Sequence, residues 1–271
     1  MIMNNVEIVI DKLDKVHGGV ISIITGTPGT GKTNSACRMC LNDKRFIRVW
    51  RGKNTCQWTI LTNTDEKIVF WLQKGSEYVI IDRNKQSIIN LSKFGEVREW
   101  DDEEQLVSNL DREAINVIYV KYGVKNSADK LMFIKEWNKI FWAMIERIYS
   151  AFISVYFDEI EDQAPESEPG FYMVVTDFSN LVKEFRKNDI HFTGILHKET
   201  ELFWKTRNKV TWKIKHKGSK KDDGSPLYPK ALTKLKLGEA YIEDTNRFDF
   251  IKFKHVGPPK KIIMKIRTLD I

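Results

Sequence analysis

Cysteine is scarce in this sequence: only three occur among 271 residues. Cys37 and Cys40 form one CxxC pair, "CRMC", and no second pair or histidine cluster follows at the spacing of metal ligands. The pair also falls on a segment that we predict to be a helix. The cysteine content therefore argues against a disulfide framework and against a zinc module, and we expect buried or surface thiols.

A membrane-spanning run and an N-terminal leader are also missing. The longest apolar stretch, residues 140–157 ("IFWAMIERIYSAFISVYF"), is interrupted by Glu146 and Arg147, too early for a spanning segment. The N-terminus lacks the order of basic and then apolar residues that marks a secretion signal. We therefore expect a soluble protein of the cytoplasm.

Internal repeats and low-complexity linkers are absent as well. Hydrophobic residues make up 42% of the chain, charged residues 30%, and eight tryptophans are scattered along it, which argues against disorder. The length suits one large α/β domain or two small ones. One exposed loop is predicted at 215–229 ("KHKGSKKDDGSPLYP"), which is rich in Gly, Ser, Pro and charge.

The net charge of +7 is unevenly placed along the chain. Residues 201–271 contain 18 Lys and Arg against 8 Asp and Glu, a net charge of +10, which leaves −3 for the first 200 residues. A run of charge is usually a solvated face. A nucleic-acid partner is the alternative for this basic C-terminal region.

The stretch "ITGTPGTGKTNS" (24–35) fills the pattern G-x-x-x-x-G-K-[ST] from Gly26 to Thr33. A β-branched run at 19–25 precedes it and a segment that can be helical follows, the order that this motif requires. Backbone N–H groups of such a loop surround a phosphate at a helix N-terminus, where the dipole favours anions. We expect Lys32 to reach the β- and γ-phosphates and Thr33 to place its hydroxyl on Mg²⁺. The predicted nucleotide-binding residues are Gly26, Thr27, Pro28, Gly29, Thr30, Gly31, Lys32, Thr33 and Asn34.

A second buried-strand pattern, "FISVYFDEIED" (152–162), ends in Asp158 and Glu159. In an open parallel sheet, ligands gather at the carboxyl ends of the strands, so these acids point toward the same crevice as the glycine loop. We expect Asp158 to hold Mg²⁺ through water as the Walker B acid, and Glu159 to polarise the attacking water. Acids that merely end a strand for solubility are the alternative.

The two acids also discriminate between reactions. Small nucleotide kinases share the glycine loop, but a kinase gains nothing from a water-activating Glu, and no arginine-rich lid with clear spacing is present. The sequence therefore favours ATP hydrolysis, with Lys32 and Glu159 as catalytic residues.

Periodicity predicts a compact α/β series after the acids. A helix carries Phe178, Leu181, Val182 and Phe185 at helical spacing. It is followed by a strand at 190–197, a short helix at 198–208, an alternating strand at 209–215 with Val210, Trp212 and Ile214 on one face, and a hairpin formed by 234–244 and 247–256.

The order of these motifs resembles the HerA/FtsK superfamily of DNA-pumping ATPases, and within it the small viral packaging ATPases and the zonula-occludens-toxin-like (Zot) proteins. The matching pattern covers residues 18–36 and 150–245. The resemblance implies an α/β fold of the RecA-like (ASCE) P-loop NTPase type over residues 1–271 as a single domain. It implies a mainly parallel central sheet flanked by helices, extra strands after the first βα unit and a C-terminal β-hairpin.

The resemblance also assigns two further residues. In the family a strand ends in a Gln that senses the γ-phosphate, and here His197 stands in that position. Family members work as rings in which an arginine completes the neighbour's site, and Arg186 is the first candidate for this trans role, with Arg207 the second.

Residues 46–120 match the family poorly and are interpreted as a β-rich elaboration at the edge of the sheet. Arg51, Gln57 and Trp58 within it are candidates for a partner-binding or DNA-facing surface, although packing explains a Trp at least as often.

The implied function is Mg²⁺-dependent ATP hydrolysis that drives DNA translocation in viral genome packaging, within the host cytoplasm if the protein is viral. The implied partners are DNA, held through its phosphates, further copies of the chain in a ring, and a viral capsid or membrane-associated docking protein. Two alternatives stay open: an AAA+-like initiator or loader, which needs a helical lid after the core, and a nucleotide-gated switch with little turnover.

Overall fold

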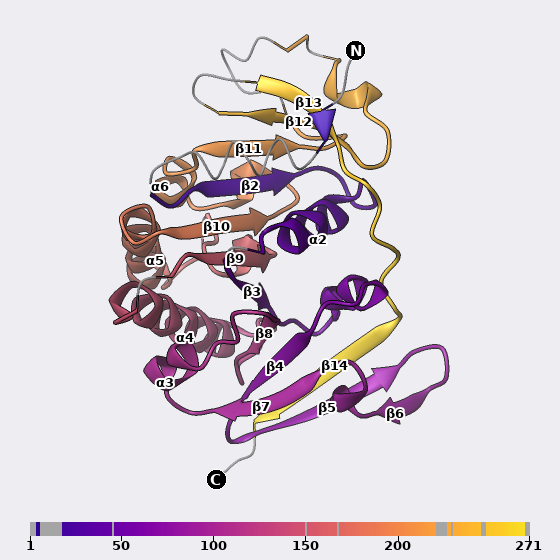
Figure 1. Cartoon of the computed structure of the whole chain (residues 1–271). Helices are drawn as coiled ribbons and strands as arrows, with labels where there is room; N and C mark the ends of the chain where they lie inside the picture. Colours follow the sequence, from indigo (N-terminus) through magenta and orange to yellow (C-terminus); the bar gives the residue numbers. More distant parts are fainter. Residues whose placement is uncertain are drawn as a thin grey trace.

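The computed structural model describes residues 4–5, 18–44, 46–149, 151–166, 168–220, 227–228, 230–244 and 248–268. Its centre is an 11-stranded sheet in the order β1-β13-β12-β11-β2-β10-β9-β3-β8-β4-β7 (Figure 1). The strands of this sheet are β1 (Asn4–Asn5), β2 (Ile21–Thr25), β3 (Ile47–Arg51), β4 (Ile68–Gln73), β7 (Glu96–Trp100), β8 (Ile115–Tyr119), β9 (Ile153–Asp158), β10 (Ile190–Ile195), β11 (Trp212–Lys215), β12 (Glu239–Glu243) and β13 (Phe248–Lys252).

The eight strands from β11 to β7 pair in parallel, and the P-loop strand β2 lies among them with β10 and β11 as neighbours. Every residue of β2, β9 and β10 is buried. Burial on both faces is what continuous apolar runs indicate, because helices or loops cover a parallel sheet on each side. The mainly parallel α/β fold predicted from the sequence is thus confirmed.

Register places the predicted motifs at one edge of the sheet. Ile195 of β10 pairs with Ile24 on one side and with Asp158 on the other. Neighbouring strands lie about 4.8 Å apart, so the start of the glycine loop and Asp158 are separated by about 10 Å across the sheet.

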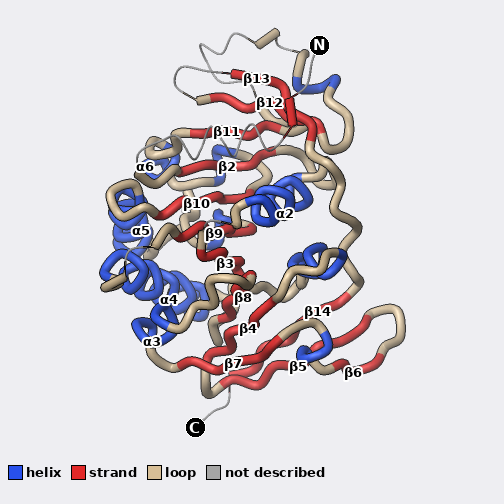
Figure 2. Tube along the Cα trace, viewed as in Figure 1, coloured by secondary structure: helices blue, strands red, loops and turns tan. Residues whose placement is uncertain are grey.

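Helices and irregular structure cover both faces of the sheet (Figure 2). On one face α4 and α5 pack over a large apolar cluster that includes Trp137, Phe141, Phe178 and Phe185. On the other face α2 and the turn η1 cover a second cluster. The helices are α2 (Lys32–Asn42), α3 (Glu103–Ser108), α4 (Ser127–Glu146), α5 (Tyr172–Phe185) and α6 (Trp204–Arg207), and the 3-10 turns are η1 (Gln57–Asn63), η2 (Leu91–Lys93), η3 (Ile160–Asp162), η4 (Glu199–Glu201) and η5 (Leu232–Lys234).

Extra strands occupy residues 46–120, as predicted. Beyond β3, strands β8, β4 and β7 extend the central sheet. A second, three-stranded sheet has the order β14-β5-β6, with β5 (Ser76–Asp82), β6 (Ser87–Ile89) and β14 (Ile262–Thr268) pairing antiparallel. The C-terminal strand therefore returns to pack on this inserted region, a long-range pairing that the sequence did not reveal.

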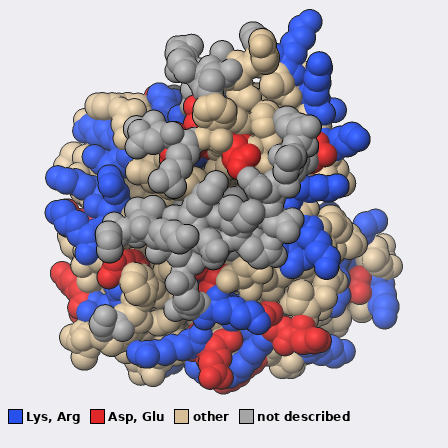
Figure 3. All heavy atoms as spheres, turned by 45° about the horizontal axis from the view of Figure 1, so that its top comes forward, with Lys and Arg blue, Asp and Glu red and all other residues tan. Residues whose placement is uncertain are grey.

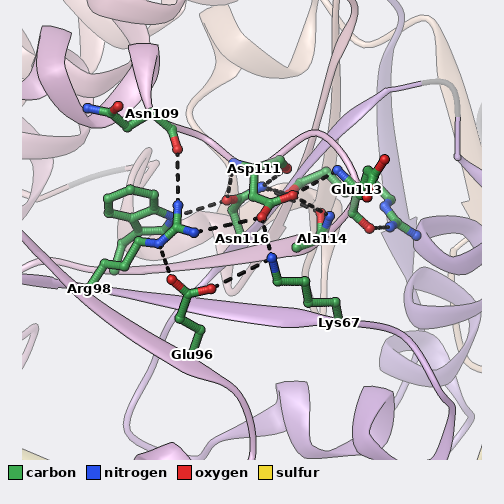
Figure 4. A network of polar contacts seen from close by, with 10 residues as sticks. Lys67, Glu96, Arg98, Asn109, Asp111, Glu113, Ala114 and Asn116 are labelled. Atoms are coloured by element: carbon green, nitrogen blue, oxygen red, sulfur yellow. Dashed lines mark hydrogen bonds and ion pairs between the residues drawn. The ribbon is translucent and has the colours of Figure 1, made fainter.

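A polar network ties the edge of the extended sheet together (Figure 4). Lys67 contacts Asp111 at 2.7 Å and Glu96 at 3.6 Å, and Arg98 contacts Glu96 at 2.7 Å. The Asn116 side chain accepts from the Asp111 N–H at 2.9 Å. Most of these charges are partly exposed, so the network fixes register at the edge more than it adds stability.

The hairpin of β12 and β13 is antiparallel, as predicted. Residues 253–261, which we call the C-terminal strap, then run past α2 and η1 to β14, as Figure 1 shows. Asn34 holds the strap: its side chain donates to the Gly257 carbonyl and accepts from the Val256 N–H, both at 2.7 Å.

Several local predictions were wrong in detail. Arg51 and Trp58 are buried, so they cannot form a partner-binding surface; Trp58 packs against Phe70 and donates to the Tyr119 hydroxyl at 2.6 Å. The strand expected at 209–215 begins only at Trp212, and Val210 packs on the opposite face from it.

The helix expected at 198–208 is broken into η4 and α6. The strand expected at 190–197 ends at Ile195. The loop expected at 215–229 starts with Lys215 and His216 buried under the glycine loop, while residues 221–226 and 229 lie outside the described residues.

Cys37 and Cys40 are buried on α2 with free thiols, as expected, and burial raises the pKa of both. Among the described residues, none of the helices combines the length and the apolar character needed to cross a bilayer.

Candidate nucleotide site

The glycine loop connects β2 to α2 and requires glycine where the backbone turns. Gly26 has φ 148°, and a Cβ there would lie 2.8 Å from the Cβ of His216 and 2.9 Å from the Thr30 hydroxyl oxygen. Gly31 has φ 96° and forms the left-handed N-cap of α2, whose first turn carries no acid. The helix therefore presents free N–H groups and the positive end of its dipole to the loop, an arrangement that suits a phosphate.

The segment that follows β11 packs against the glycine loop and holds its backbone in place. The Thr27 N–H donates to the Lys217 carbonyl at 3.0 Å, and the His216 N–H donates to the Thr25 carbonyl at 2.9 Å. The His216 ring contacts Ser35 of α2, with Nε2 and Oγ 3.0 Å apart. Burial lowers the pKa of His216 to about 4, so its ring is neutral at physiological pH.

Lys32 is buried and points back along the loop. Its Nζ donates to the carbonyls of Gly26 at 2.7 Å and Thr27 at 3.2 Å. It also lies 3.3 Å from Nδ1 of His197, at the carboxyl end of β10. Because an ammonium only donates, Nδ1 is the acceptor and the ring proton lies on Nε2. Burial lowers the pKa of Lys32, against the opposing charge of Asp158.

The two predicted acids end β9 at a sharp turn. Asp158 is buried, and Glu159 has the left-handed backbone φ 57°, ψ 59°. Arg51 of the adjacent strand β3 stabilises this turn: its guanidinium donates to the carbonyls of Asp158 and Glu159 and forms an ion pair with Asp162 at 2.8 Å. The guanidinium also lies against the rings of Phe133 and Phe157, 4.7 and 4.8 Å from their centroids.

A second cation from the same segment reaches the carboxylates themselves. Nζ of Lys53 lies 2.9 Å from Oδ2 of Asp158 and 2.8 Å from Oε1 of Glu159, and its side chain is only 9% exposed. Burial alone would lower the pKa of Lys53, but the two carboxylates outweigh it and raise that pKa. Burial would likewise raise the pKa of Glu159, but Lys53 and Arg51 keep it lowered.

These groups surround a cavity of about 440 Å³. Its walls include the glycine loop, Lys53, the two acids, Glu161, His197, Gln57 and the strap residues His255, Gly257, Pro258 and Pro259. Asn34 also lines it, although its amide is engaged by the strap backbone. Glu161 is largely buried, and burial raises its pKa to about 7.

The donor set suits a hard divalent cation. Thr33 and Asp158 both line the cavity, and Oδ2 of Asp158 is a buried carboxylate oxygen that lies 2.9 Å from the Lys53 ammonium. Hydroxyl and carboxylate oxygens are the ligands that Mg²⁺ prefers. The residues present therefore fit the predicted magnesium position.

The arginine candidates lie elsewhere. Arg186 is exposed at the end of α5, and its carbonyl accepts from the N–H of Gly19, which precedes β2. The glycine loop follows the other end of β2, so Arg186 stands roughly 20 Å from the cavity along the strand direction. Arg207 is half-buried and donates to the Glu199 carbonyl at 3.4 Å.

Sequence reasoning missed Lys53, Glu161 and the strap. A signal for the first was present, because "RGK" (51–53) directly follows a buried apolar strand, and the carboxyl ends of parallel strands meet at one edge. The strap gave no local signal, because its contacts join residues 222 positions apart.

The fold has counterparts among solved structures. The chain is similar to the genome packaging NTPase B204 from Sulfolobus turreted icosahedral virus 2 in complex with AMPPCP, with a TM-score of 0.54, 12% identity, and coverage of 87% of this chain and 98% of that one. It is also similar to VirB4 of Thermoanaerobacter pseudethanolicus, with a TM-score of 0.58, 11% identity, and coverage of 89% and 90%. B204, the DNA-packaging ATPase from Sulfolobus Turreted Icosahedral Virus, matches with a TM-score of 0.50, 15% identity, and coverage of 89% and 100%.

The chain has a P-loop NTPase fold. The resemblance predicted from the motifs is thereby confirmed at the level of the fold. No protein-family model matches the sequence, and no curated protein matches it.

Proposed function

We propose that the protein hydrolyses ATP with Mg²⁺ and uses the energy to translocate DNA, in the packaging of a viral genome. The observation that supports this most is one cavity lined both by Lys32 and Thr33 of the glycine loop and by Asp158 and Glu159, with only strand β10 between β2 and β9. A packaging role is favoured by the fold shared with B204, a genome packaging NTPase.

Each residue of the cavity has a part in the proposed hydrolysis. The loop N–H groups and the Lys32 ammonium bind the phosphates and neutralise their charge. Glu159 orients a water and takes its proton as the water oxygen attacks the γ-phosphorus and the bond to the β–γ bridging oxygen breaks. His197, beside Lys32, donates a hydrogen bond from its Nε2–H to the γ-phosphate as a sensor. Thr33 and Asp158 would hold Mg²⁺, which would neutralise charge at the phosphates.

DNA contact is assigned to the end of the molecule that carries β12, β13 and η5. Figure 3 looks toward this end, where Lys and Arg side chains gather along the right-hand rim of the view. Exposed lysines of the described chain in this region are Lys217, Lys220, Lys230, Lys234, Lys236, Lys252 and Lys254. Such cations bind phosphates without reading sequence, so binding weakens steeply as salt rises.

Assembly into a ring is part of the proposal, since Arg186 is too far from its own cavity to act there. In a head-to-tail ring an exposed arginine of one copy can reach the site of the next. A capsid or membrane-associated protein would dock the ring.

The test is ATP turnover with and without DNA, at low and at physiological salt. We expect DNA to stimulate turnover and Lys32→Ala to abolish tight Mg·ATP binding, because the ammonium neutralises phosphate charge. Lys44→Ala, at an exposed lysine outside the cavity, is the control and should leave turnover unchanged. Tight ATP binding without turnover would instead indicate a nucleotide-gated switch, and unchanged binding in Lys32→Ala would reject the site.

A further inference from the structure

A second cavity, of about 270 Å³, lies at the N-terminal end of α5 and takes no part in the proposed hydrolysis. Its apolar lining includes Phe171, Tyr172, Val175 and Phe203, so we call it the aromatic pocket. Phe171, Val175 and Phe203 are buried. Tyr172 is 57% exposed, and its ring meets the Phe203 ring edge to face with the centroids 6.0 Å apart. One wall of the pocket is therefore an aromatic ring that a partner can reach.

The backbone around the aromatic pocket continues from the strands of the nucleotide site. The turn η3 follows β9, and the turn η4 follows β10. The residues that come after these two turns pair with each other: the Phe203 N–H donates to the Ala164 carbonyl at 2.8 Å, and the Glu166 N–H donates to the Glu201 carbonyl at 3.1 Å. A group bound in the pocket would thus contact the two segments that lead to it from the nucleotide cavity.

Two carboxylates line the aromatic pocket, and their partners differ. Glu168 forms an ion pair with Lys130 of α4. Glu166 has no ion pair within the described part of the chain, and its Oε2 is buried without a hydrogen-bond partner. A buried carboxylate oxygen without a partner costs free energy, which a cation binding to it would offset. The faces of the surrounding rings also attract cations, so both features of the pocket favour the same kind of ligand.

The rim of the aromatic pocket already binds one ammonium in this way. Nζ of Lys205 lies 4.8 Å from the centroid of the Tyr172 ring and 5.6 Å from that of Trp204, and it donates to the Tyr172 hydroxyl at 2.8 Å. Lys205 does not line the pocket itself. Glu166 inside the pocket therefore calls for a cation from elsewhere.

The chain itself is a rich source of such cations, with a net charge of +7. The helix α5 has unlike ends: Tyr172 of the pocket begins it, the exposed Lys183 lies in its last turn, and the exposed Arg186 follows. Head-to-tail contacts bring unlike surfaces of two copies together. A cationic surface of one copy would thereby meet the pocket of the next, and charge complementarity favours a second copy as the partner.

We propose that the aromatic pocket binds the cationic end of a lysine or arginine side chain from a neighbouring copy of this chain, with Glu166 as its counter-ion and the Tyr172 ring as its apolar wall. This inference rests on the ring that is part of the proposed function. It adds a contact between copies that is separate from the nucleotide cavity.

The first experiment tests the ligand chemistry of the pocket with n-butylammonium, which matches the end of a lysine side chain. Titrated into the protein at low salt, it should shift the NMR signals of the Val175 methyl groups. The uncharged analogue 1-butanol should bind at least about tenfold more weakly. Glu166→Gln should lower the n-butylammonium affinity about tenfold, the size of one charge-assisted hydrogen bond. Equal binding of the two probes would overturn the inference.

The second experiment tests the partner, by sedimentation velocity with Mg·AMPPCP over a range of protein concentrations. Glu166→Gln and Tyr172→Ala should each raise the dissociation constant between copies about tenfold. Glu103→Gln is the control, because Glu103 is also a half-buried carboxylate but lies on α3, outside the pocket, and it should assemble as the wild type does. Tyr172 is exposed, so its variant keeps the test open if Glu166→Gln does not fold.

The possible outcomes separate this inference from the proposed function. Assembly of wild-type strength in both pocket variants would overturn the inference and leave the ring in place; if n-butylammonium still binds, the cation belongs to a different protein. A wild-type protein that stays monomeric with AMPPCP would reject the ring, and this inference with it. Weaker assembly in both variants, with wild-type assembly in Glu103→Gln, would support the contact between copies.

Discussion

Arg51 donates from Nη1 to the carbonyl oxygen of Glu159, 2.9 Å away. A buried cation on β3 thus fixes the left-handed backbone of the residue that follows the neighbouring strand β9. A non-glycine residue in that conformation costs roughly 1–2 kcal/mol. The contacts of Arg51 with two carbonyls and with Asp162 offset this cost and hold the Glu159 side chain over the cavity.

Arg51→Lys should lower ATP turnover by about tenfold or more, because an ammonium cannot bind two carbonyls and a carboxylate in the fork geometry of a guanidinium. Arg48→Lys is the matched control: Arg48 also lies buried on β3 and pairs with Glu66 at 2.8 Å, but it lies toward the other end of the strand. Both variants should lose about 2 kcal/mol of unfolding free energy in urea titrations. Equal turnover in the two variants would show that Arg51 acts only through stability.

Glu159→Gln should leave Mg·ATP binding intact and slow hydrolysis by about 10² or more, the range for loss of a general base. The amide keeps the shape of the side chain but cannot take a proton from water. Single-turnover hydrolysis and nucleotide affinity, measured in parallel, check this. If the variant loses nucleotide affinity while its hydrolysis rate is unchanged, Glu159 is a structural or metal-holding residue.

Mixing two inactive variants tests the trans role of Arg186. The residue is exposed and stands at the opposite end of β2 from the glycine loop. Arg186→Ala and Lys32→Ala should each be inactive, and a mixture should regain some ATP turnover because the Lys32→Ala copy lends its arginine. Lys187→Ala, at the neighbouring exposed cation, should stay active. Full activity in Arg186→Ala would eliminate this residue and leave Arg207 as the candidate.

Glu161 should make the nucleotide-free protein less stable as pH rises. Its pKa is raised from 4.5 to about 7, so the folded state holds a proton that the unfolded chain has lost between these values. Stability therefore falls from about pH 4.5 to pH 7, by up to about 3 kcal/mol for this group. Urea unfolding at pH 5 and pH 8 should show a weaker pH dependence in Glu161→Gln than in the wild type. Glu77→Gln, at an exposed site, is the control and should keep the wild-type dependence.

The sequence was sufficient for those parts of the molecule whose signal is local. Strands β2, β9 and β10 are buried on both faces, and such strands appear as continuous apolar runs. The glycine loop and the stripe of α5 likewise follow from residue spacing within a dozen positions. The C-terminal strands β12 and β13 form the antiparallel hairpin that the sequence predicts.

Features that depend on which strands become neighbours could not be predicted. The role of "RGK" (51–53) depends on β3 lying beside β9, so the sequence alone suggests a surface position for Arg51, which is buried. In the sequence, Val210 continues the alternation of Trp212 and Ile214 in β11. The strand begins only at Trp212, however, and Val210 packs on the opposite face of the sheet. The sequence places His216 in an exposed basic loop, because only the folded chain brings it against Gly26.

The C-terminal strap connects the two sheets and forms part of the wall of the nucleotide cavity on its way. It joins the β12–β13 hairpin at one end of the central sheet to β14 in the three-stranded sheet. Asn34 fastens it to α2, and a hydrogen bond from the Lys260 N–H to Thr59 Oγ1 at 2.9 Å fastens it to η1. Two consecutive prolines, Pro258 and Pro259, fix φ within it and make it stiff. The strap therefore connects the hairpin directly to the wall of the cavity and to the first turn of the helix that follows the glycine loop.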